Sequence, residues 1–453
     1  MNEGVYGCNC LLSSTSAPRL SEKIVHPCHP SHPLMLLLDG PPIYSNGKCN
    51  LCQQKVNIVY HCSLCDFSLD VQCAKKRPQL TVNASKCHEH TLSLLVGPIS
   101  FTCNACGTCG DASPYVCTPC FLTFHRDCIN RPHVININRH EHRIAHTNSL
   151  VFGNWICEIC QKEVNWRHGS YTCKICPSYA VHSRCATRKD VWNGRELEGV
   201  PEEVLDIKPF EVIKVGVINH FSHKHHNLRL IEDAIITNGG ESIRCEACTR
   251  VIYSGKHYSC MKCNFVLHEK CANFPRRKRH GLFIKPLSLH TEKPNLGYFR
   301  CDACWRVTNG FVYICPDRSG LLDVLCATLS RFTDLHCHPH SLFLTTLDKG
   351  TCGACKESNN SVLHCVECKF TLDFWCATLP KRKKHKCDDH FLFLRNGQYE
   401  SSGTYWCEIC ETIIDSVEWF YTCEDCGVVC HIDCVVGEFA NIKPGIVATN
   451  DDV

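Results

Sequence analysis

The 453-residue sequence has no apolar run long enough to span a membrane as a helix. Its longest candidates, LMLLL at 34–38 and VIKVGVI at 212–218, fall far short of the roughly 20 residues that such a helix needs. The opening MNEGVYGCNCLLSS also lacks the basic segment and apolar stretch of a secretory signal. We therefore expect an intracellular protein without a transmembrane segment, located in the cytoplasm, the nucleus or both.

Patterns of familiar catalytic chemistry are missing as well. The sequence shows no catalytic triad, no phosphate-binding loop and no open three-ligand metal site. Apolar residues occur in short scattered runs, so no window predicts a large continuous core. We expect a non-enzymatic protein built from many small units.

Cysteine and histidine, by contrast, are abundant, with 42 Cys and 28 His in the chain. Cysteine makes up roughly 9% of the residues, which is typical of a scaffold held by disulfides or by metal ions. In a chain without a secretion signal, Cys pairs separated by two residues favour zinc over disulfides. Zinc is therefore the predicted cofactor.

The cysteines belong to a unit that repeats about every 50 residues and occurs seven times. Its cleanest copy runs from Cys245 to Cys271, as CEAC followed by YSCMKCNFVLHEKC. Each copy contains a first CxxC and ends in a His or Asp followed three residues later by Cys. In chain order these residues are Cys49, Cys52, Asp70, Cys73; Cys103, Cys106, His125, Cys128; Cys157, Cys160, His182, Cys185; Cys245, Cys248, His268, Cys271; Cys301, Cys304, Asp323, Cys326; Cys352, Cys355, Asp373, Cys376; and Cys407, Cys410, His431, Cys434.

A second CxxC and an upstream pair of His or Cys complete most copies. In copy 3 the upstream pair has a different spacing from the others, and copy 5 keeps only His280 and Cys315 of this set. In chain order the residues are His29, His32, Cys62, Cys65; Cys87, His90, Cys117, Cys120; His140, His142, Cys173, Cys176; His223, His226, Cys260, Cys263; Cys337, His340, Cys365, Cys368; and Cys387, His390, Cys423, Cys426.

Copy 5 indicates which ligands share an ion. Arg277 stands where the upstream partner should be, and Arg318 replaces the second Cys of the later CxxC. Pairing the ligands in sequence order would damage two sites, whereas an interleaved pairing leaves one site complete. We therefore predict a cross-brace of two four-coordinate sites. The outer-type site joins the first CxxC to the terminal pair, and the upstream-type site joins the upstream pair to the second CxxC. Each copy then holds up to two zinc ions, and copy 5 holds one.

Asp70, Asp323 and Asp373 occupy the terminal position that holds His in the other copies. We interpret them as carboxylate ligands, which zinc accepts. The alternative is that they only form hydrogen bonds near the site.

The predicted fold is a tandem array of small zinc-dominated units, each with short β-hairpins and a brief helical turn after the last Cys. Alternating apolar residues around the ligands, such as Tyr258 and Leu267, are typical of short half-buried strands. The predicted units are 26–78, 85–131, 138–188, 220–276, 280–330, 335–380 and 385–437, with a linker at 189–219.

The motifs HPSHPLMLL and HFSHKHHNL, followed by CxxC and Y-x-CxxC-x-F-x-L-[HD]-x2-C, give the chain a family resemblance from about residue 26 to 437. It resembles the plant cysteine/histidine-rich, divergent C-one zinc-finger proteins, which are relatives of the diacylglycerol/phorbol-ester-type finger. The resemblance implies two zinc ions per finger in a cross-brace and a role in signal transduction and stress responses. Copy 5, with half of one site missing, and copy 3, with an extra residue before His182, depart from the pattern.

Three classes of function compete. A multi-finger scaffold would bind proteins and, as a further option, lipid, although the loops expected for diacylglycerol binding are not recognisable. Enzymatic activity would be thiol–disulfide exchange, as in a protein-disulfide reductase, or ubiquitin ligation. Zinc-committed CxxC pairs are closed, however, and no thioredoxin-like pattern surrounds them. We favour the scaffold.

Nucleic-acid binding would depend on the basic runs PRRKR at 275–279 and KRKK at 381–384. We interpret these runs as solvated connectors, with a nuclear-import signal as the alternative. Zinc-bound cysteines are thiolates, so sites with three Cys carry about −1 each. With these charges the formal +3 of the chain becomes roughly −7. Such an acidic protein is a poor binder of phosphate backbones.

Removal of zinc should unfold the chain, because units of about 50 residues bury too little surface to fold without metal. Circular dichroism in excess chelator should show loss of the strand signal, and readdition of zinc should restore it. A near-native spectrum in excess chelator would contradict this expectation.

Overall fold

The computed structural model describes residues 20–83, 85–202, 207–232, 243–292, 297–317, 319–329, 332–333, 338–345, 350–359, 362–396, 405–415, 417–437 and 441–443. The copies, now called fingers 1 to 7, share one plan. A hairpin before the first CxxC pairs with a second hairpin around the later CxxC, and together they form a four-stranded antiparallel sheet. In most fingers a separate two-stranded ribbon flanks the first CxxC.

Fingers 1 to 3 each carry this sheet, and they show how the ribbon and helix vary. Finger 1 has a single bridge, between Lys48 and Lys55, in place of the ribbon. The elements are, for finger 1, β1 Lys23–His26, β2 His29–Leu37, β3 Val59–Cys62, β4 Phe67–Asp70 and α1 Val71–Lys75; for finger 2, β5 Thr81–Val82, β6 Leu92–Leu94, β7 Phe101–Thr102, β8 Cys109–Gly110, β9 Tyr115–Cys117 and β10 Leu122–Phe124; for finger 3, β11 Val134–Ile135, β12 Ile144–Thr147, β13 Trp155–Ile156, β14 Glu163–Val164, β15 Ser170–Cys173, β16 Ala180–His182 and α2 Ser183–Ala186.

Fingers 4 and 5 follow, and finger 4 has one extra strand in its sheet. The elements are, for finger 4, β17 Phe210–Lys214, β18 Val217–His220, β19 Leu228–Ile231, β20 His257–Cys260, β21 Val266–His268 and α3 Glu269–Ala272; for finger 5, β22 Arg277–His280, β23 Phe283–His290, β24 Phe299–Arg300, β25 Val307–Thr308, β26 Val312–Ile314, β27 Leu321–Asp323 and α4 Val324–Thr328.

Fingers 6 and 7 complete the described part of the chain. Their elements are, for finger 6, β28 Phe332–Thr333, β29 Leu342–Thr345, β30 Gly350–Thr351, β31 Ser358–Asn359, β32 Val362–Cys365, β33 Thr371–Leu372 and α5 Phe374–Ala377; for finger 7, β34 Arg382–His385, β35 Asp388–Arg395, β36 Tyr405–Trp406, β37 Ile413–Ile414, β38 Phe420–Thr422, β39 Val429–His431 and α6 Ile432–Val436.

The sheets and short helices agree with the predicted hairpins, with two differences. First, the helical turn begins directly after the terminal His or Asp and contains the last Cys, whereas the sequence placed it after that Cys. Asp70, for example, caps α1, and Cys73 lies inside it. Second, each sheet begins a few residues before the first predicted ligand, because its first strand contributes no ligand. The last part of the predicted linker 189–219 forms β17 and most of β18 of finger 4.

The basic runs are strands, not solvated connectors. Arg277–His280 is β22 and Arg382–His385 is β34, the first strands of their sheets. Lys278 Nζ donates a hydrogen bond to the Ala327 carbonyl at 2.6 Å, and Lys383 Nζ donates to the Val436 carbonyl at 2.9 Å. Both carbonyls lie toward the end of the short helix that contains the last Cys of the finger, where a cation is favoured. The lysines therefore tie the first strand of a finger to its helix.

In several fingers a recurring tyrosine ties the start of the finger to its centre. Tyr115, Tyr313 and Tyr421 are buried and stand two residues before the second CxxC. Their hydroxyls donate to backbone carbonyls 36 to 41 residues earlier, at 2.6 to 2.7 Å. A buried hydroxyl without a partner would be costly, so this bond fixes where the first strand enters the finger.

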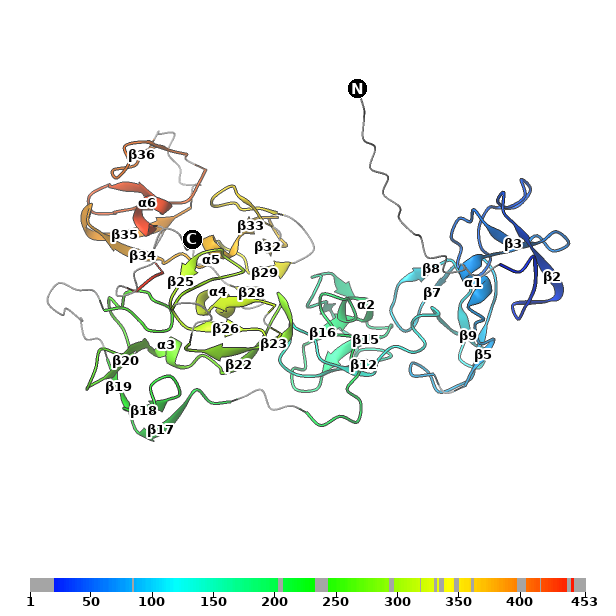
Figure 1. Cartoon of the computed structure of the whole chain (residues 1–453), viewed down its shortest axis with the longest axis horizontal. Coiled ribbons are helices and arrows are strands. Elements are labelled where there is room, and N and C mark those ends of the chain that lie inside the picture. Colours follow the sequence, from blue (N-terminus) through cyan, green and yellow to red (C-terminus); the bar gives the residue numbers. More distant parts are fainter. Residues whose placement is uncertain are drawn as a thin grey trace, which may run out of the picture.

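The fingers form an elongated array in which fingers 1 and 2 lie at one end, finger 3 in the middle and fingers 4 to 7 at the other end (Figure 1). Fingers 1, 2 and 3 each have a core of their own. The core of fingers 4 to 7, in contrast, is one continuous cluster that runs from Ile218 to Val436. The C-terminal four fingers therefore behave as a single packed body.

Specific backbone joints hold neighbouring fingers together. The Phe311 N–H of finger 5 donates to the Ala247 carbonyl of finger 4 at 2.9 Å, and the Trp419 N–H of finger 7 donates to the Ala354 carbonyl of finger 6 at 3.2 Å. Gly310 allows the first of these contacts, since a Cβ at this position would lie 2.3 Å from the Ala247 oxygen. Each acceptor is the Ala between the two Cys of a first CxxC.

Candidate metal centres

The outer-type residues come together in space. Cys103, Cys106, His125 and Cys128 form one group whose ligand atoms all lie within 4.8 Å of one another, and Cys157, Cys160, His182 and Cys185 form another. In finger 4, His268 Nδ1 lies 3.4 Å from Cys248 Sγ and 3.7 Å from Cys271 Sγ. In finger 7, His431 Nδ1 lies 3.3 Å from Cys410 Sγ.

A tight turn aims the first CxxC of each finger at its site. The residue after the second Cys has a positive φ, a conformation that costs non-glycine residues roughly 1–2 kcal/mol. Its N–H donates to the carbonyl of the first Cys, as from Gln161 to Cys157 at 2.8 Å. This turn brings both sulfurs to one side of the backbone. The residues with positive φ at this position are Gln53, Gly107, Gln161, Thr249, Trp305, Lys356 and Glu411.

Where the terminal ligand is His, its two ring nitrogens have different partners. In fingers 3 and 7 the Nδ1 atoms face the thiols, while the Nε2 atoms of His182 and His431 lie 2.9 and 3.2 Å from the carbonyls of Glu163 and Ile413. A metal-binding imidazole needs such an acceptor for its second nitrogen, which fixes the tautomer and the ring orientation. No feature of the sequence indicates these carbonyl partners.

Where the terminal ligand is Asp, the carboxylate has two roles. Asp70 Oδ1 accepts from the Cys73 N–H at 2.7 Å and caps α1, while Oδ2 accepts from the Cys52 thiol at 3.0 Å. Asp323 and Asp373 repeat the arrangement, with Oδ2 at 3.3 and 3.1 Å from Cys304 and Cys355. The carboxylate therefore reaches the thiol cluster with one oxygen and the helix with the other, whereas the terminal His residues of fingers 3, 4 and 7 form no such cap.

The protonation of these carboxyls depends on their surroundings. Burial, together with the neighbouring Cys301 and Cys352 thiols, raises the pKa of Asp323 to about 7 and also raises that of Asp373. For Asp70, burial acts in the same direction, but hydrogen bonds from the Cys52 thiol and the Cys73 N–H outweigh it and lower the pKa to about 2. A cation in the cluster would favour the ionised form in all three.

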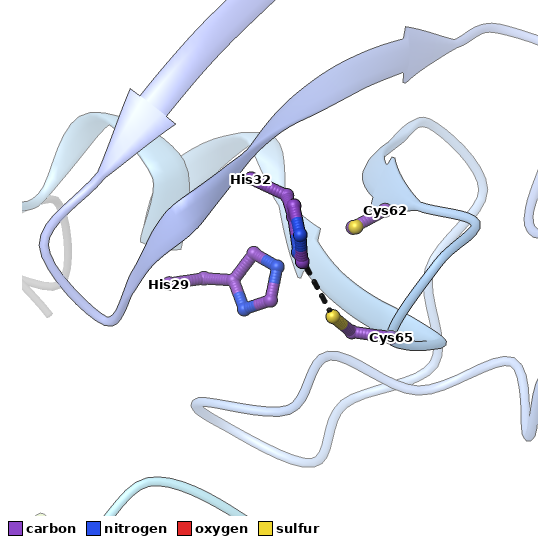
Figure 2. A group of neighbouring side chains, drawn as sticks. All are labelled: His29, His32, Cys62 and Cys65. Carbon is purple, nitrogen blue, oxygen red and sulfur yellow. Dashed lines mark hydrogen bonds between the residues drawn. The ribbon is translucent and has the colours of Figure 1, made fainter.

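The upstream-type residues also converge. In finger 1, His29, His32, Cys62 and Cys65 form one group, and His32 Nδ1 lies 3.1 Å from Cys65 Sγ (Figure 2). His140, His142, Cys173 and Cys176 of finger 3 form an equivalent group despite their different spacing. In finger 4, His223 Nε2 lies 3.5 Å from Cys263 Sγ.

Fingers 2 and 7 correct the predicted upstream ligands. In finger 2 the group consists of His88, His90, Cys117 and Cys120, so His88 takes the position predicted for Cys87. In finger 7, Asp388 Oδ1 lies 3.6 Å from Cys426 Sγ, and His390 Nδ1 lies 3.1 Å from the same sulfur. Asp388 thus takes the position predicted for Cys387.

In finger 6 the position predicted for Cys337 lies outside the described residues. His338 Nε2 lies 3.4 Å from Cys368 Sγ, and His340 Nδ1 lies 3.7 Å from Cys365 Sγ. The histidine directly after the cysteine therefore faces the CxxC pair, as His88 does in finger 2. In finger 2 the two candidates lie in the tight turn closed by the Ser85–His88 bridge, so the shape of this turn decides which of them faces the CxxC pair.

The displaced cysteines pack away from the ligand clusters. Cys87 is buried in the core of finger 2. Cys387 Sγ lies 3.9 Å from Cys430 Sγ, and Cys430 is fully buried in the apolar slot of its finger. Cys87 and Cys387 therefore act as small core residues.

An aromatic ring supports the first upstream His. His29 stacks on Phe67 with ring centroids 4.7 Å apart, and His223 stacks on Phe265 at 4.4 Å. Phe67 and Phe265 stand two residues after the second CxxC, which explains the Phe of the motif. In finger 7 the equivalent residue is Val428, and there the ligand position holds Asp388 instead of His.

Finger 5 replaces its upstream-type site with ordinary packing and an ion pair. Phe283 occupies the first ligand position and Gly320 the supporting aromatic position, where a Cβ would lie only 2.0 Å from the Phe283 ring. Lys285, at the second ligand position, forms an ion pair with Asp317 at 3.1 Å beside Cys315. The prediction that Arg277 replaces a ligand is wrong, because Arg277 lies in β22, ahead of these positions.

The clusters fit a tetrahedral zinc ion. Sulfur at 2.3 Å and nitrogen at 2.0–2.1 Å from such an ion lie about 3.5 Å apart, which matches the S–N distances above. Four buried atoms of the upstream-type groups also have no hydrogen-bond partner among the described residues: His29 Nε2, His88 Nε2, His226 Nδ1 and Asp388 Oδ2. Buried polar atoms are rarely left unpaired, so a bound cation explains them.

The corrected ligands change the charge of the loaded protein. Fingers 2, 6 and 7 have two thiolates in the upstream-type group instead of three, so these groups no longer add a negative charge. The net charge becomes roughly −4 instead of −7, which is still acidic.

The fold and these clusters define a tandem zinc-finger protein of the cross-brace type. Five stretches, 27–74, 86–129, 138–186, 221–272 and 385–435, match the family model of the C1 domain and cover more than half of the chain. The chain belongs to the C1 domain family, whose members bind zinc. No curated protein and no solved structure matches the chain. The described helices are only four or five residues long, so none could cross a membrane.

Single substitutions in finger 2 should show whether His88 or Cys87 is the ligand of the upstream-type group. His88→Ala should reduce the zinc content by about one ion per chain, because it removes a ligand from the upstream-type group. Cys87→Ser should leave the zinc content unchanged, because Cys87 only packs in the core. Mass spectrometry of the native protein measures both, and zinc loss in the Cys87 variant alone would reverse the assignment.

Substitutions at Asp70 should show whether its carboxylate binds metal. Asp70→Ala should lose about one zinc ion and also lose the cap of α1. Asp70→His should retain the ion, because it supplies the ligand found in other fingers. Full zinc content in the Ala variant would contradict the role of Asp70 as a metal ligand, and its only role would then be to cap α1.

Proposed function

We propose that this chain is a zinc-stabilised scaffold that binds protein partners in intracellular signalling. We also propose two zinc ions in each finger except finger 5, which holds one. The main support is the continuous core of fingers 4 to 7, which fixes four small modules into one body with a large composite surface. Tandem rigid modules of this kind allow several weak contacts to act together.

Lipid is a second candidate partner, supported by one exposed apolar tip. The β17–β18 hairpin of finger 4 presents Val212, Ile213 and Val215, of which Val215 is fully exposed. Lys214 lies between them. Apolar groups beside a cation suit the interface of an anionic bilayer, and they equally suit a protein surface.

The competing functions receive less support. The basic runs that favoured nucleic acid are tied into their sheets, with Lys278 and Lys383 bonded to helix carbonyls. In fingers 2 and 3, for example, the first CxxC stands opposite its terminal pair, and zinc bound there would keep these thiols from exchange chemistry. We therefore consider nucleic-acid binding, disulfide reduction and ubiquitin ligation less well supported than the scaffold function.

Affinity capture with the zinc-loaded full chain tests the proposal. We expect the capture to identify a defined protein partner. After purification, this partner should form a stable complex with the zinc-loaded chain in sedimentation experiments. It should form no complex with the metal-free chain. Anionic lipid vesicles, duplex DNA, insulin reduction and ubiquitin transfer serve as parallel assays. Catalytic turnover would contradict the scaffold proposal and favour an enzymatic function. Salt-sensitive retention on DNA would contradict it and favour nucleic-acid binding.

A further inference from the structure

A cleft of about 400 Å³ lies where fingers 5, 6 and 7 meet. Three of the seven Trp residues of the chain line it, namely Trp305, Trp375 and Trp419. Trp305 is 64% exposed, although it is the residue with positive φ after the first CxxC of finger 5. A large aromatic side chain held exposed in a strained turn has no evident role in packing.

The cleft already shows how it holds a cation. The Arg306 guanidinium lies over the Trp375 ring, 4.0 Å from its centroid, and Arg306 Nη2 lies 3.4 Å from Asp433 Oδ1. A cation over a Trp face with a carboxylate beside it is a recognised binding arrangement. Arg306 and Asp433 come from fingers 5 and 7, so the arrangement exists only because the fingers pack together.

The charges of the cleft are unbalanced. Glu357, Glu418 and Asp433 line it, and Arg306 is the one Lys or Arg among its lining residues. Arg306 already faces Asp433, which leaves Glu357 and Glu418 without a cation from the lining. Burial and the neighbouring Asp415 raise the pKa of Glu418, and they outweigh Lys356 and His431, which act in the opposite direction.

Bound zinc would make the cleft more negative. Cys304, Cys355, Asp373 and Cys376 of two outer-type groups line its floor. Three thiolates and one carboxylate exceed the charge of one zinc ion, so each of these loaded groups is anionic. The surroundings therefore favour a positively charged ligand.

We propose that this cleft binds a basic segment of a protein partner, with a Lys or Arg side chain placed against Trp305 and countered by Glu357 and Glu418. The inference rests on the proposed scaffold function and names its partner class and its site. Charge complementarity selects the occupant, since the Trp faces and the excess of carboxylates in the lining both attract a cation. Fingers 5, 6 and 7 all contribute residues to the site, so it can form only when these fingers are packed together.

Peptide binding to the zinc-loaded full chain tests this site. The probe is a twelve-residue peptide rich in Lys and Arg and free of Trp, and the control is the same peptide with Glu in place of each basic residue. Binding is followed by calorimetry and by Trp fluorescence. The basic peptide should bind, with an affinity that falls as salt rises, and the acidic peptide should not.

Matched variants locate the binding. Trp305→Ala and the double variant Glu357→Gln, Glu418→Gln should each weaken the basic peptide about tenfold. Trp406→Ala and Glu211→Gln should leave the affinity within about twofold, because Trp406 is similarly exposed at 58% and both residues lie outside the cleft. Zinc content and circular dichroism of each variant confirm that the fold is intact, and the Gln variants keep the test valid if Trp305→Ala disturbs its turn.

The outcomes separate this proposal from the scaffold proposal. Equal binding of basic and acidic peptides, or unchanged affinity in both cleft variants, overturns the cleft as the site. If a captured protein partner still binds those variants at full strength, the scaffold function stands and only the cleft is rejected. Loss of that partner together with the basic peptide supports both.

Discussion

The convergence of four ligand atoms within a few ångströms is the constraint on which each finger depends. About 50 residues bury too little apolar surface to fold alone, so the clusters must supply much of the folding free energy. The local structure serves this purpose. The positive-φ turn after each first CxxC brings its sulfurs together. The aromatic stack beneath His29 and the carbonyl behind His182 orient the rings.

Finger 5 shows what replaces an ion when its ligands are lost. Phe283 fills the space against Gly320, and the Lys285–Asp317 pair joins β23 to the turn between β26 and β27. The sheet of finger 5 keeps the same strand order as its neighbours. An apolar ring and an exposed ion pair are weaker than coordination, but finger 5 is also held on both sides by the shared core of fingers 4 to 7.

That shared core links fold to function. The joints at Ala247 and Ala354 bring neighbouring fingers close enough for their outer-type clusters to border common surfaces. The cleft with Trp305 and Glu418 exists only at such a junction, because its residues come from three fingers. A single finger would present these groups far apart. Composite surfaces of this kind give a scaffold specificity that no individual module has.

Sequence spacing alone determined the repeat, the cross-brace and most members of the clusters, because CxxC turns and zinc chemistry are local. It failed where neighbouring residues compete, as with Cys87 and His88, or Cys387 and Asp388. Both members of each pair are plausible ligands, and only the path of the backbone through the turn at this point decides which one reaches the cluster. The tertiary structure also decided the carbonyl partners, the joints and the cleft, since these depend on contacts between segments far apart in the chain.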